Sequence, residues 1–338
     1  MFQELEGNQT RQYIDAEQTR KAWLAALTRS NSFRGSMYWQ TKNGSDYLTR
    51  EYSHSGIRQY QSLGVRSVET EHILNEFKKG RELSSQAVKS LTDEMQRHVR
   101  VNVAMRVGRT PSVVVNILES LRKSGIFEHF MVIGTNALYA YETCAGVRFS
   151  GDLTATTDMD LLCDSRKRLT LVSGSHDEAF KTGGLLAILK KVDATFSLVA
   201  DEEYRAVNGK GYYVDLIKRR SKSLFDDKEP QQLIKNSDDF WAAKITNIDW
   251  ILSAPKFRQV VVAENGNMAE MIAPDPRAFA LYKTWLSQKD DRDPMKKPRD
   301  SRQAKAVIHL IDDRFPHLAF KDIHVFPSRI NQMINSGD

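Results

Sequence analysis

Cysteine is scarce in this chain, which carries only Cys144 and Cys163 in 338 residues. Two thiols cannot form a disulfide framework, and no Cys-x-x-Cys pair occurs that would indicate a zinc ribbon or a thiol redox motif. A chain of this length buries a large core without disulfides. We therefore expect a protein of the reducing cytoplasm.

Long apolar runs are also missing. No stretch of about eighteen consecutive apolar residues occurs, and a membrane-spanning helix needs such a stretch. The most apolar segment, residues 130–147, is interrupted by Asn136 and Glu142. Residues 1–10 are polar and acidic and lack the layout of a secretion signal. The sequence therefore predicts a cytoplasmic protein without a membrane partner.

The composition is that of a globular protein with a modest excess of positive charge. Hydrophobic residues make up 41% and charged residues 27% of the chain, with a net charge of +6 and a pI of about 9.1. This excess permits a polyanionic partner such as a nucleotide or RNA, although many basic proteins bind neither. The length suits several domains. We expect an N-terminal hairpin and helical module (1–108), an α/β core (109–225), and a C-terminal hairpin and helical region that completes the cleft (226–338).

The N-terminal module is predicted to contain an aromatic β-hairpin. Two β-prone runs flank Asn43-Gly44, and both of these residues tolerate the positive φ of a tight turn. The hairpin is either structural or a flap that grips a substrate. The structural interpretation is favoured because aromatic side chains usually pack on something. A third interpretation is an adaptor that recruits a partner protein through Tyr38 and Trp39.

A candidate phosphate-binding turn follows a short apolar run. Phe130 to Ile133 predicts a buried strand, Gly134-Thr135 ends it, and a helix is predicted to begin at Asn136. A strand, a Gly-Thr turn and a helix start present backbone N–H groups to an anion. A turn of this kind commonly only connects two elements, so it needs further support.

Three carboxylates on predicted strands form the most informative pattern. Asp158 and Asp160 are two residues apart, so their side chains share one face of a strand. Asp215 lies in a later strand and is also flanked by apolar residues. Three converging carboxylates repel one another unless a cation neutralises them. Oxygen ligands without His or Cys suit Mg²⁺ or Mn²⁺, and a pair of such ions can activate a hydroxyl and stabilise a leaving phosphate oxygen.

The remaining helices and turns are predicted from local signals. Thr110 is expected to cap a helix that begins at Pro111, and residues 237–252 are expected to be helical. A second hairpin is predicted around Asn265-Gly266. Asp275 is predicted to cap a helix that begins near Pro276 and ends near Gln288.

Basic residues near the C-terminus are candidate ligands for phosphate. Lys283 lies on the helix that follows Asp275, and a basic stretch runs from residue 289 to residue 305. The alternative is a solvated charged linker, because aspartates partly neutralise the stretch. Arg148 either reaches a triphosphate from its loop or pairs with Asp152.

Four segments together resemble a known family. They are residues 132–142 (VIGTNALYAYE), 155–162 (ATTDMDLL), 211–217 (GYYVDLI) and 274–280 (PDPRAFA). Their order is similar to that of the polymerase-beta-like nucleotidyltransferase superfamily, whose signature is a Gly-Gly or Gly-Ser turn, then Asp-x-Asp, then a third Asp. More closely, the segments resemble a bacterial group of stand-alone nucleotidyltransferases. The resemblance covers roughly residues 95–310.

The resemblance implies a role for each matching residue. Gly134 and Thr135, followed by Asn136, would hold the phosphates of a nucleoside triphosphate such as ATP. Asp158 and Asp160 would bind both metal ions, and Asp215 would bind the metal nearest the attacking hydroxyl and help to deprotonate it. Thr135 departs from the commoner Ser or Gly, and the gap from Thr135 to Asp158 is longer than in the minimal motif.

The expected fold is α/β, with a polymerase-beta-type core. The expected reaction transfers a nucleoside monophosphate from an NTP to a hydroxyl and releases pyrophosphate, with two Mg²⁺ or Mn²⁺ ions. The acceptor stays open among RNA (notably a tRNA 3′ end), a protein side chain and a small molecule. The alternative function is a non-catalytic nucleotide- or RNA-binding module on the same fold.

Overall fold

The computed structural model describes residues 2–54, 57–164, 177–220, 232–234, 236, 238–327 and 330. The chain divides into two compact units, one of residues 11–105 and one of residues 1–10 with 106–338. The domain boundary predicted after residue 225 lies outside the described residues. The division into three domains stays a prediction.

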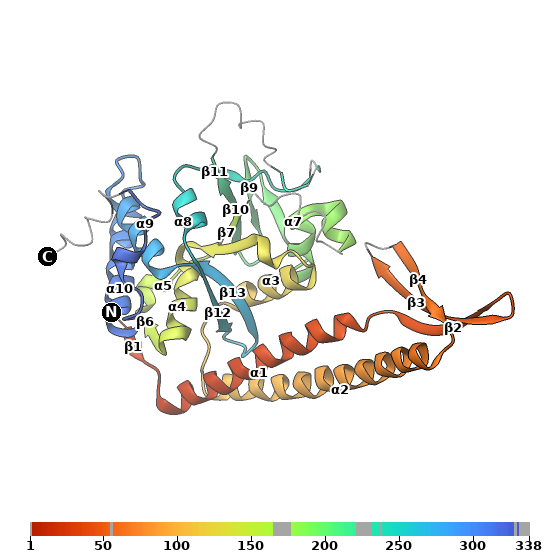
Figure 1. Cartoon of the computed structure of the whole chain (residues 1–338). Helices are drawn as coiled ribbons and strands as arrows, with labels where there is room; N and C mark the ends of the chain where they lie inside the picture. The colour runs from red at the N-terminus through yellow and green to blue at the C-terminus, as the bar shows by residue number, and fades with distance from the viewer. Residues whose placement is uncertain are drawn as a thin grey trace. The chain divides into compact units, whose positions relative to one another are not determined.

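The unit of residues 11–105 consists of a long helix pair and a three-stranded antiparallel sheet (Figure 1). The two helices run antiparallel, because Gln12 Nε2 donates to Asn102 Oδ1 at 2.9 Å and Trp23 Nε1 donates to Thr92 Oγ1 at 3.0 Å. The sheet has the order β2-β3-β4. The elements are α1 (Gly7–Ser32), β2 (Ser36–Lys42), β3 (Ser45–His54), β4 (Ile57–Val65) and α2 (Val68–Ala104).

The predicted hairpin is present as strands β2 and β3. Asn43 and Gly44 form its turn with φ values of 51° and 77°. Strand β4 extends the hairpin and was not predicted. Leu48 on β3 is fully buried, and the Arg50 guanidinium lies 5.6 Å from the centre of the Phe77 ring on α2. Residues of this sheet therefore pack on helix α2, and the choice among the three interpretations of the hairpin stays a prediction.

The second unit is built around a mixed sheet (Figure 1). Its order is β5-β7-β10-β9-β8, and β11 pairs with β10 beyond the end of the β9 pairing. Strand β10 is parallel to β7 and β11, whereas the other pairs are antiparallel. This sheet and its helices confirm the predicted α/β class. The strands are β5 (Phe130–Ile133), β7 (Asp158–Cys163), β8 (Ser197–Val199), β9 (Glu202–Val207), β10 (Tyr213–Arg219) and β11 (Ala243–Ile245).

Helices and two strand pairs pack around this sheet. Val114, Ile117 and Leu121 recur at helical spacing on α3 and are fully buried in the core. The strand pairs are β1 (Phe2–Glu4) with β6 (Val147–Phe149) and β12 (Lys256–Val262) with β13 (Met268–Pro274). The helices are α3 (Ser112–Lys123), α4 (Leu138–Ala145), α5 (Gly151–Thr154), α7 (Glu178–Val192), α8 (Asp249–Ser253), α9 (Pro276–Gln288) and α10 (Lys297–Arg314), with 3₁₀ turns η1 (Phe127–His129), η2 (Gly134–Ala137) and η5 (Phe320–Asp322).

Helix α9 begins where the sequence predicts. The Asp275 side chain accepts a hydrogen bond from the backbone N–H of Arg277 at 2.9 Å, and Pro276 occupies the first helical position. The hairpin around Asn265-Gly266 is present as β12 and β13. Among the helices that the structure describes, none combines the length and apolar character that crossing a membrane requires.

Two local predictions are wrong. The segment predicted as a helix over 237–252 contains strand β11 and only the short helix α8. Strand β10 offers its edge to β11, and this tertiary pairing outweighs the local helical pattern. Thr110 does not cap α3, because its backbone joins the second hairpin: Thr110 N donates to Val262 O at 3.1 Å. Pro111 is the N-cap instead.

Helix α7 is interrupted at Gly184, and a buried carboxylate explains the interruption. Gly184 has a φ of 64°, and a Cβ placed there would lie 1.8 Å from Asp239 Oδ2. Asp239 is fully buried, and its Oδ1 accepts the backbone N–H of Leu186 at 3.0 Å. The carboxylate therefore caps the second part of the helix.

Replacing Gly184 by alanine is expected to lower the free energy of unfolding by about 2 kcal/mol or more. Its backbone, with a φ of 64° and a ψ of −152°, is nearly restricted to glycine and costs other residues about 1–3 kcal/mol before the clash with Asp239 is added. Urea denaturation measures the change. Gly151→Ala is the matched control, since Gly151 has open space and no positive φ. Equal stability of the two variants would contradict this account.

Candidate active site

Three carboxylates meet on two neighbouring parallel strands. Asp160 on β7 lies directly beside Asp215 on β10, and Asp158 lies beside Tyr213. Asp158 and Asp160 share one strand face, while Met159 between them is fully buried on the other. Asp215 is 6% exposed, whereas Asp158 and Asp160 are partly buried. The structure therefore brings together the three carboxylates that the sequence singles out.

The surroundings of Asp160 strongly shift its pKa. Burial, together with the negative charges of Asp158 and Asp215, raises the pKa of Asp160 to about 7, although Lys283 and Lys296 act in the opposite direction. At neutral pH the Asp160 carboxyl is therefore only partly ionised, and a bound cation would favour its ionised form. Donor oxygens without His or Cys suit a hard divalent cation such as Mg²⁺.

An arginine already compensates part of that charge. Arg205 on β9 lies opposite Asp215, its Nε donates to Asp215 Oδ1 at 2.7 Å, and its Nη2 donates to Asp215 Oδ2 at 2.8 Å. Among the described residues, no group of three or more His, Cys, Asp and Glu side chains is arranged to hold a metal ion. Asp158 and Asp160 could provide oxygen ligands for a divalent cation, and Asp215 could join them by sharing its oxygens with Arg205.

The Gly134-Thr135 turn lies against this cluster. Strand β5 ends at Ile133, and the turn η2 begins at Gly134 with a φ of 67°. A Cβ at Gly134 would lie 2.1 Å from Asp160 Oδ2. Glycine is therefore required at this position both by the backbone and by the adjacent carboxylate. The turn continues as 3₁₀ helix before α4 begins at Leu138.

The two residues after Gly134 are fixed by neighbouring elements. Thr135 Oγ1 accepts from Arg299 Nη2 at 3.1 Å and from Gln303 Nε2 at 3.2 Å, both on α10. Asn136 Nδ2 donates to the backbone oxygen of Asp158 at 2.6 Å and so braces β7. Its Oδ1 is buried without a partner among the described residues.

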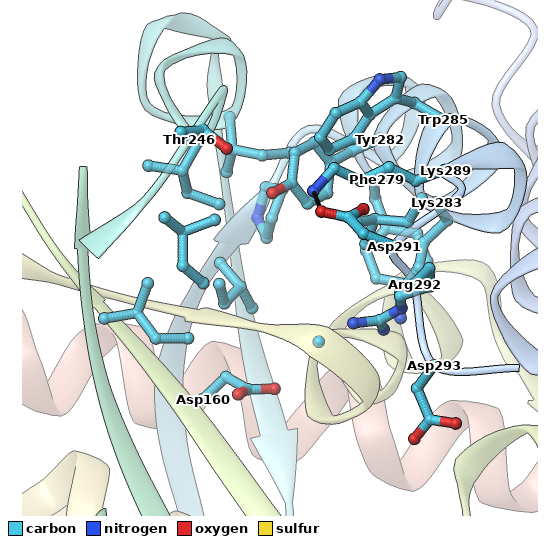
Figure 2. A pocket seen from close by; sticks show the side chains of 18 residues that line it. Asp160, Thr246, Phe279, Tyr282, Lys283, Trp285, Lys289, Asp291, Arg292 and Asp293 are labelled. Atoms are coloured by element: carbon cyan, nitrogen blue, oxygen red, sulfur yellow. Dashed lines mark hydrogen bonds and ion pairs between the residues drawn. The ribbon is translucent and has the colours of Figure 1, made fainter. Parts of the chain in front are cut away.

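A pocket of about 300 Å³ opens beside the cluster. Figure 2 shows Trp285 and Tyr282 of α9 at one end of this pocket and Asp160 at the other. Gly134 also lines it. The remaining lining residues are mostly apolar or cationic: Ile133, Ile217, Ile245, Thr246, Ile248, Ile251, Pro274, Phe279, Lys283, Leu286, Lys289, Asp291, Arg292 and Asp293. An aromatic wall combined with cations and carboxylates suits a ligand that has both a planar ring and phosphates.

Two cations of the pocket wall share one buried carboxylate. Lys283 Nζ lies 2.6 Å from Asp300 Oδ1, and Arg292 Nε donates to Asp300 Oδ2 at 2.8 Å. Asp300 is 2% exposed and Lys283 is 9% exposed. Burial lowers the pKa of Lys283, and the Asp300 carboxylate opposes that shift. The sequence singles out Lys283, but it indicates Asp300 only as one of the aspartates that neutralise the basic stretch.

Arg148 does not join this pocket. It lies on β6, where its guanidinium donates to the backbone oxygen of Arg106. Asp152, its alternative partner from the sequence, pairs with Arg302 at 2.8 Å. From the basic C-terminal stretch, Arg299 reaches the Gly-Thr turn instead.

A comparison with protein families gives one match. A family model described as Nucleotidyltransferase matches residues 112–325, well over half of the chain. The matched range contains the Gly-Thr turn, the three carboxylates and the pocket, whereas residues 11–105 lie outside it. No curated protein and no solved structure matches the chain.

Proposed function

The chain belongs to the nucleotidyltransferase family, and from that premise we propose that it transfers a nucleoside monophosphate from an NTP to a hydroxyl and releases pyrophosphate. The observation that carries this proposal is the meeting of Asp158, Asp160 and Asp215 beside the Gly134 turn. The four sequence segments that resemble the polymerase-beta-like superfamily and its bacterial stand-alone group support membership in both.

Divalent cations complete the proposed site. Asp158 and Asp160 would hold two ions, Mg²⁺ or Mn²⁺, and Asp215 would share in holding one of them. When bound, these ions would neutralise charge on the triphosphate and lower the pKa of the attacking hydroxyl. The raised pKa of Asp160 and the purely oxygen donor set support this assignment.

The pocket residues provide the other contacts of the nucleotide. The backbone of the Gly134-Thr135 turn would bind phosphate, as the exposed N–H groups of such turns do. Lys283 and Arg292 would place positive charge along the triphosphate. The aromatic side chains of α9 would cover the nucleobase, because stacked rings bind every base.

RNA is the acceptor class that the charge distribution supports best. Residues 11–105 contain fifteen Lys and Arg residues and ten Asp and Glu residues, which gives this unit a net charge of +5 out of the chain's +6. Positive charge concentrated in one unit favours a polyanion over a neutral acceptor. A protein side chain and a small molecule remain the other two acceptor classes to test.

A second candidate function is a non-catalytic module that binds nucleotide or RNA. One observation favours it, namely that Arg205 occupies both oxygens of Asp215. A module of this kind would bind nucleotide without turning it over.

The experiment incubates the pure full chain with Mg²⁺ or Mn²⁺ and each α-labelled NTP. Cellular RNA, a protein extract or a pool of small hydroxyl compounds is added separately, and an Asp158→Ala/Asp160→Ala double variant serves as control. Label that moves to one pool only with the wild type supports transfer and identifies the acceptor class. Nucleotide binding without transfer to any pool would favour the non-catalytic candidate.

Replacing Asp300 by asparagine is expected to weaken NTP binding about tenfold and to lower the free energy of unfolding by about 3 kcal/mol, because Lys283 and Arg292 lose their shared buried partner. Calorimetric titration and urea denaturation measure the two effects. Asp290→Asn is the matched control, since Asp290 is exposed and does not line the pocket. An Asp300 variant that binds NTP as tightly as the control would contradict this role.

A further inference from the structure

We propose that Arg205 is a positioning residue that orients Asp215 and competes with the divalent cation for it, so that the metal binds tightly only together with the nucleotide. This inference rests on the proposed function and specifies how the same site is regulated. Neither the family match nor the sequence pattern singles out Arg205.

The contact between the two side chains is specific. Arg205 and Asp215 are directly opposite one another on antiparallel strands β9 and β10. Both carboxylate oxygens accept from the guanidinium, at 2.7 Å and 2.8 Å. A two-bonded guanidinium–carboxylate pair fixes the plane of the carboxylate as well as its position. Asp215 therefore cannot rotate without breaking at least one of these bonds.

The guanidinium is itself fixed from other sides. Arg205 Nη1 donates to Glu202 Oε2 at 2.8 Å. The guanidinium carbon lies 5.4 Å from the centre of the Tyr204 ring and 5.2 Å from that of Tyr213. These contacts fix Arg205 beside the carboxylate cluster. Its side chain is nevertheless 24% exposed, so solvent and ligands can reach it.

The competition follows from charge. A carboxylate has about four lone-pair positions, so Asp215 can accept both bonds from Arg205 and still donate an electron pair to a metal. The positively charged guanidinium of Arg205 nevertheless lies next to the oxygens that a metal cation would approach. Its charge repels the cation and weakens cation binding in the absence of nucleotide. The negative charge of a triphosphate in the adjacent pocket offsets this repulsion. The metal is therefore expected to bind tightly with the nucleotide and weakly without it.

The test measures Mn²⁺ binding to the full chain by calorimetry, with and without a non-hydrolysable NTP analogue. We compare the wild type with Arg205→Gln, which removes the charge, and with Arg258→Gln as a control. Arg258 lies on β12, pairs with Glu128 and is not part of the pocket. We expect Arg205→Gln to bind Mn²⁺ alone about tenfold more tightly than the wild type, with a smaller gain from the nucleotide, while its kcat falls. The control is expected to match the wild type.

Tighter metal binding combined with slower turnover separates this role from a structural one, because loss of structure weakens both. Arg205→Lys provides a second measurement that does not depend on the folding of Arg205→Gln. Lysine keeps the positive charge but cannot make both hydrogen bonds to the Asp215 carboxylate. We therefore expect wild-type Mn²⁺ affinity and a reduced kcat. Unchanged or weaker Mn²⁺ binding by Arg205→Gln, or wild-type kcat in Arg205→Lys, would overturn the proposal. If the wild type transfers nucleotide but either of these results is found, the proposal about Arg205 fails and the proposed function stands.

Discussion

Replacing Asp160 by asparagine is expected to lower the rate of nucleotidyl transfer roughly a thousandfold, a change of about 4 kcal/mol in the activation free energy. Asp160 lies beside Asp215, on the same strand face as Asp158 and against Gly134. Asparagine keeps the size of the side chain but removes the charge that would hold a divalent cation. Steady-state kinetics with labelled NTP measures the loss.

The same substitution is expected to stabilise the metal-free fold at high pH, a result that would exclude unfolding as the cause of the lost activity. The pKa of Asp160 is raised to about 7 in the folded chain, so the folded state binds this proton more tightly than the unfolded state. The wild type therefore loses stability as the pH rises from about 4 through 7. In EDTA, urea denaturation should show that Asp160→Asn exceeds the wild type in its free energy of unfolding by more at pH 8 than at pH 5. An equal difference in the free energy of unfolding at both pH values would contradict the raised pKa of Asp160.

Replacing Gly134 by alanine is expected to lower kcat/KM by about a hundredfold, because a displacement of the reacting groups by about 1 Å has an effect of that size. The added Cβ would lie 2.1 Å from Asp160 Oδ2, so the carboxylate or the turn must move. The left-handed backbone, with a φ of 67°, adds a cost of about 1 kcal/mol in stability.

Gly146→Ala separates the two causes. Gly146 ends α4 with a φ of 66°, almost the value at Gly134, but a Cβ there meets nothing within 4 Å. This control should lose a similar amount of stability from backbone strain and retain its activity. If both variants lose activity equally, strain alone explains the result and close contact with Asp160 is not the reason for glycine at residue 134.

The carboxylate site could be predicted because its signals are local. Alternation along β7 places Asp158 and Asp160 on one face, and apolar neighbours indicate the strand that contains Asp215. The Gly-Thr turn follows an apolar run that is buried as expected. Each of these features depends on a few adjacent residues and on the two-residue period of a strand.

Arg205 could not be found in the same way. Its contact with Asp215 depends on the register between β9 and β10, and a shift of one residue would turn it to the other face of the sheet. The contact of Arg299 with the Gly-Thr turn and that of Asp300 with Lys283 depend on how α10 packs on the rest of the unit, which is a long-range property. The sequence predicts a loop around Arg148, whereas this residue lies on β6, which pairs with β1 near the start of the chain.

The central claim is that the carboxylates of β7 and β10 hold a divalent cation with the nucleotide. Electron paramagnetic resonance of Mn²⁺, titrated into the full chain with a non-hydrolysable NTP analogue, tests it directly when the wild type is compared with Asp160→Asn. The account predicts stoichiometric Mn²⁺ binding by the wild type and its loss in the variant. Equal binding by both proteins would contradict it.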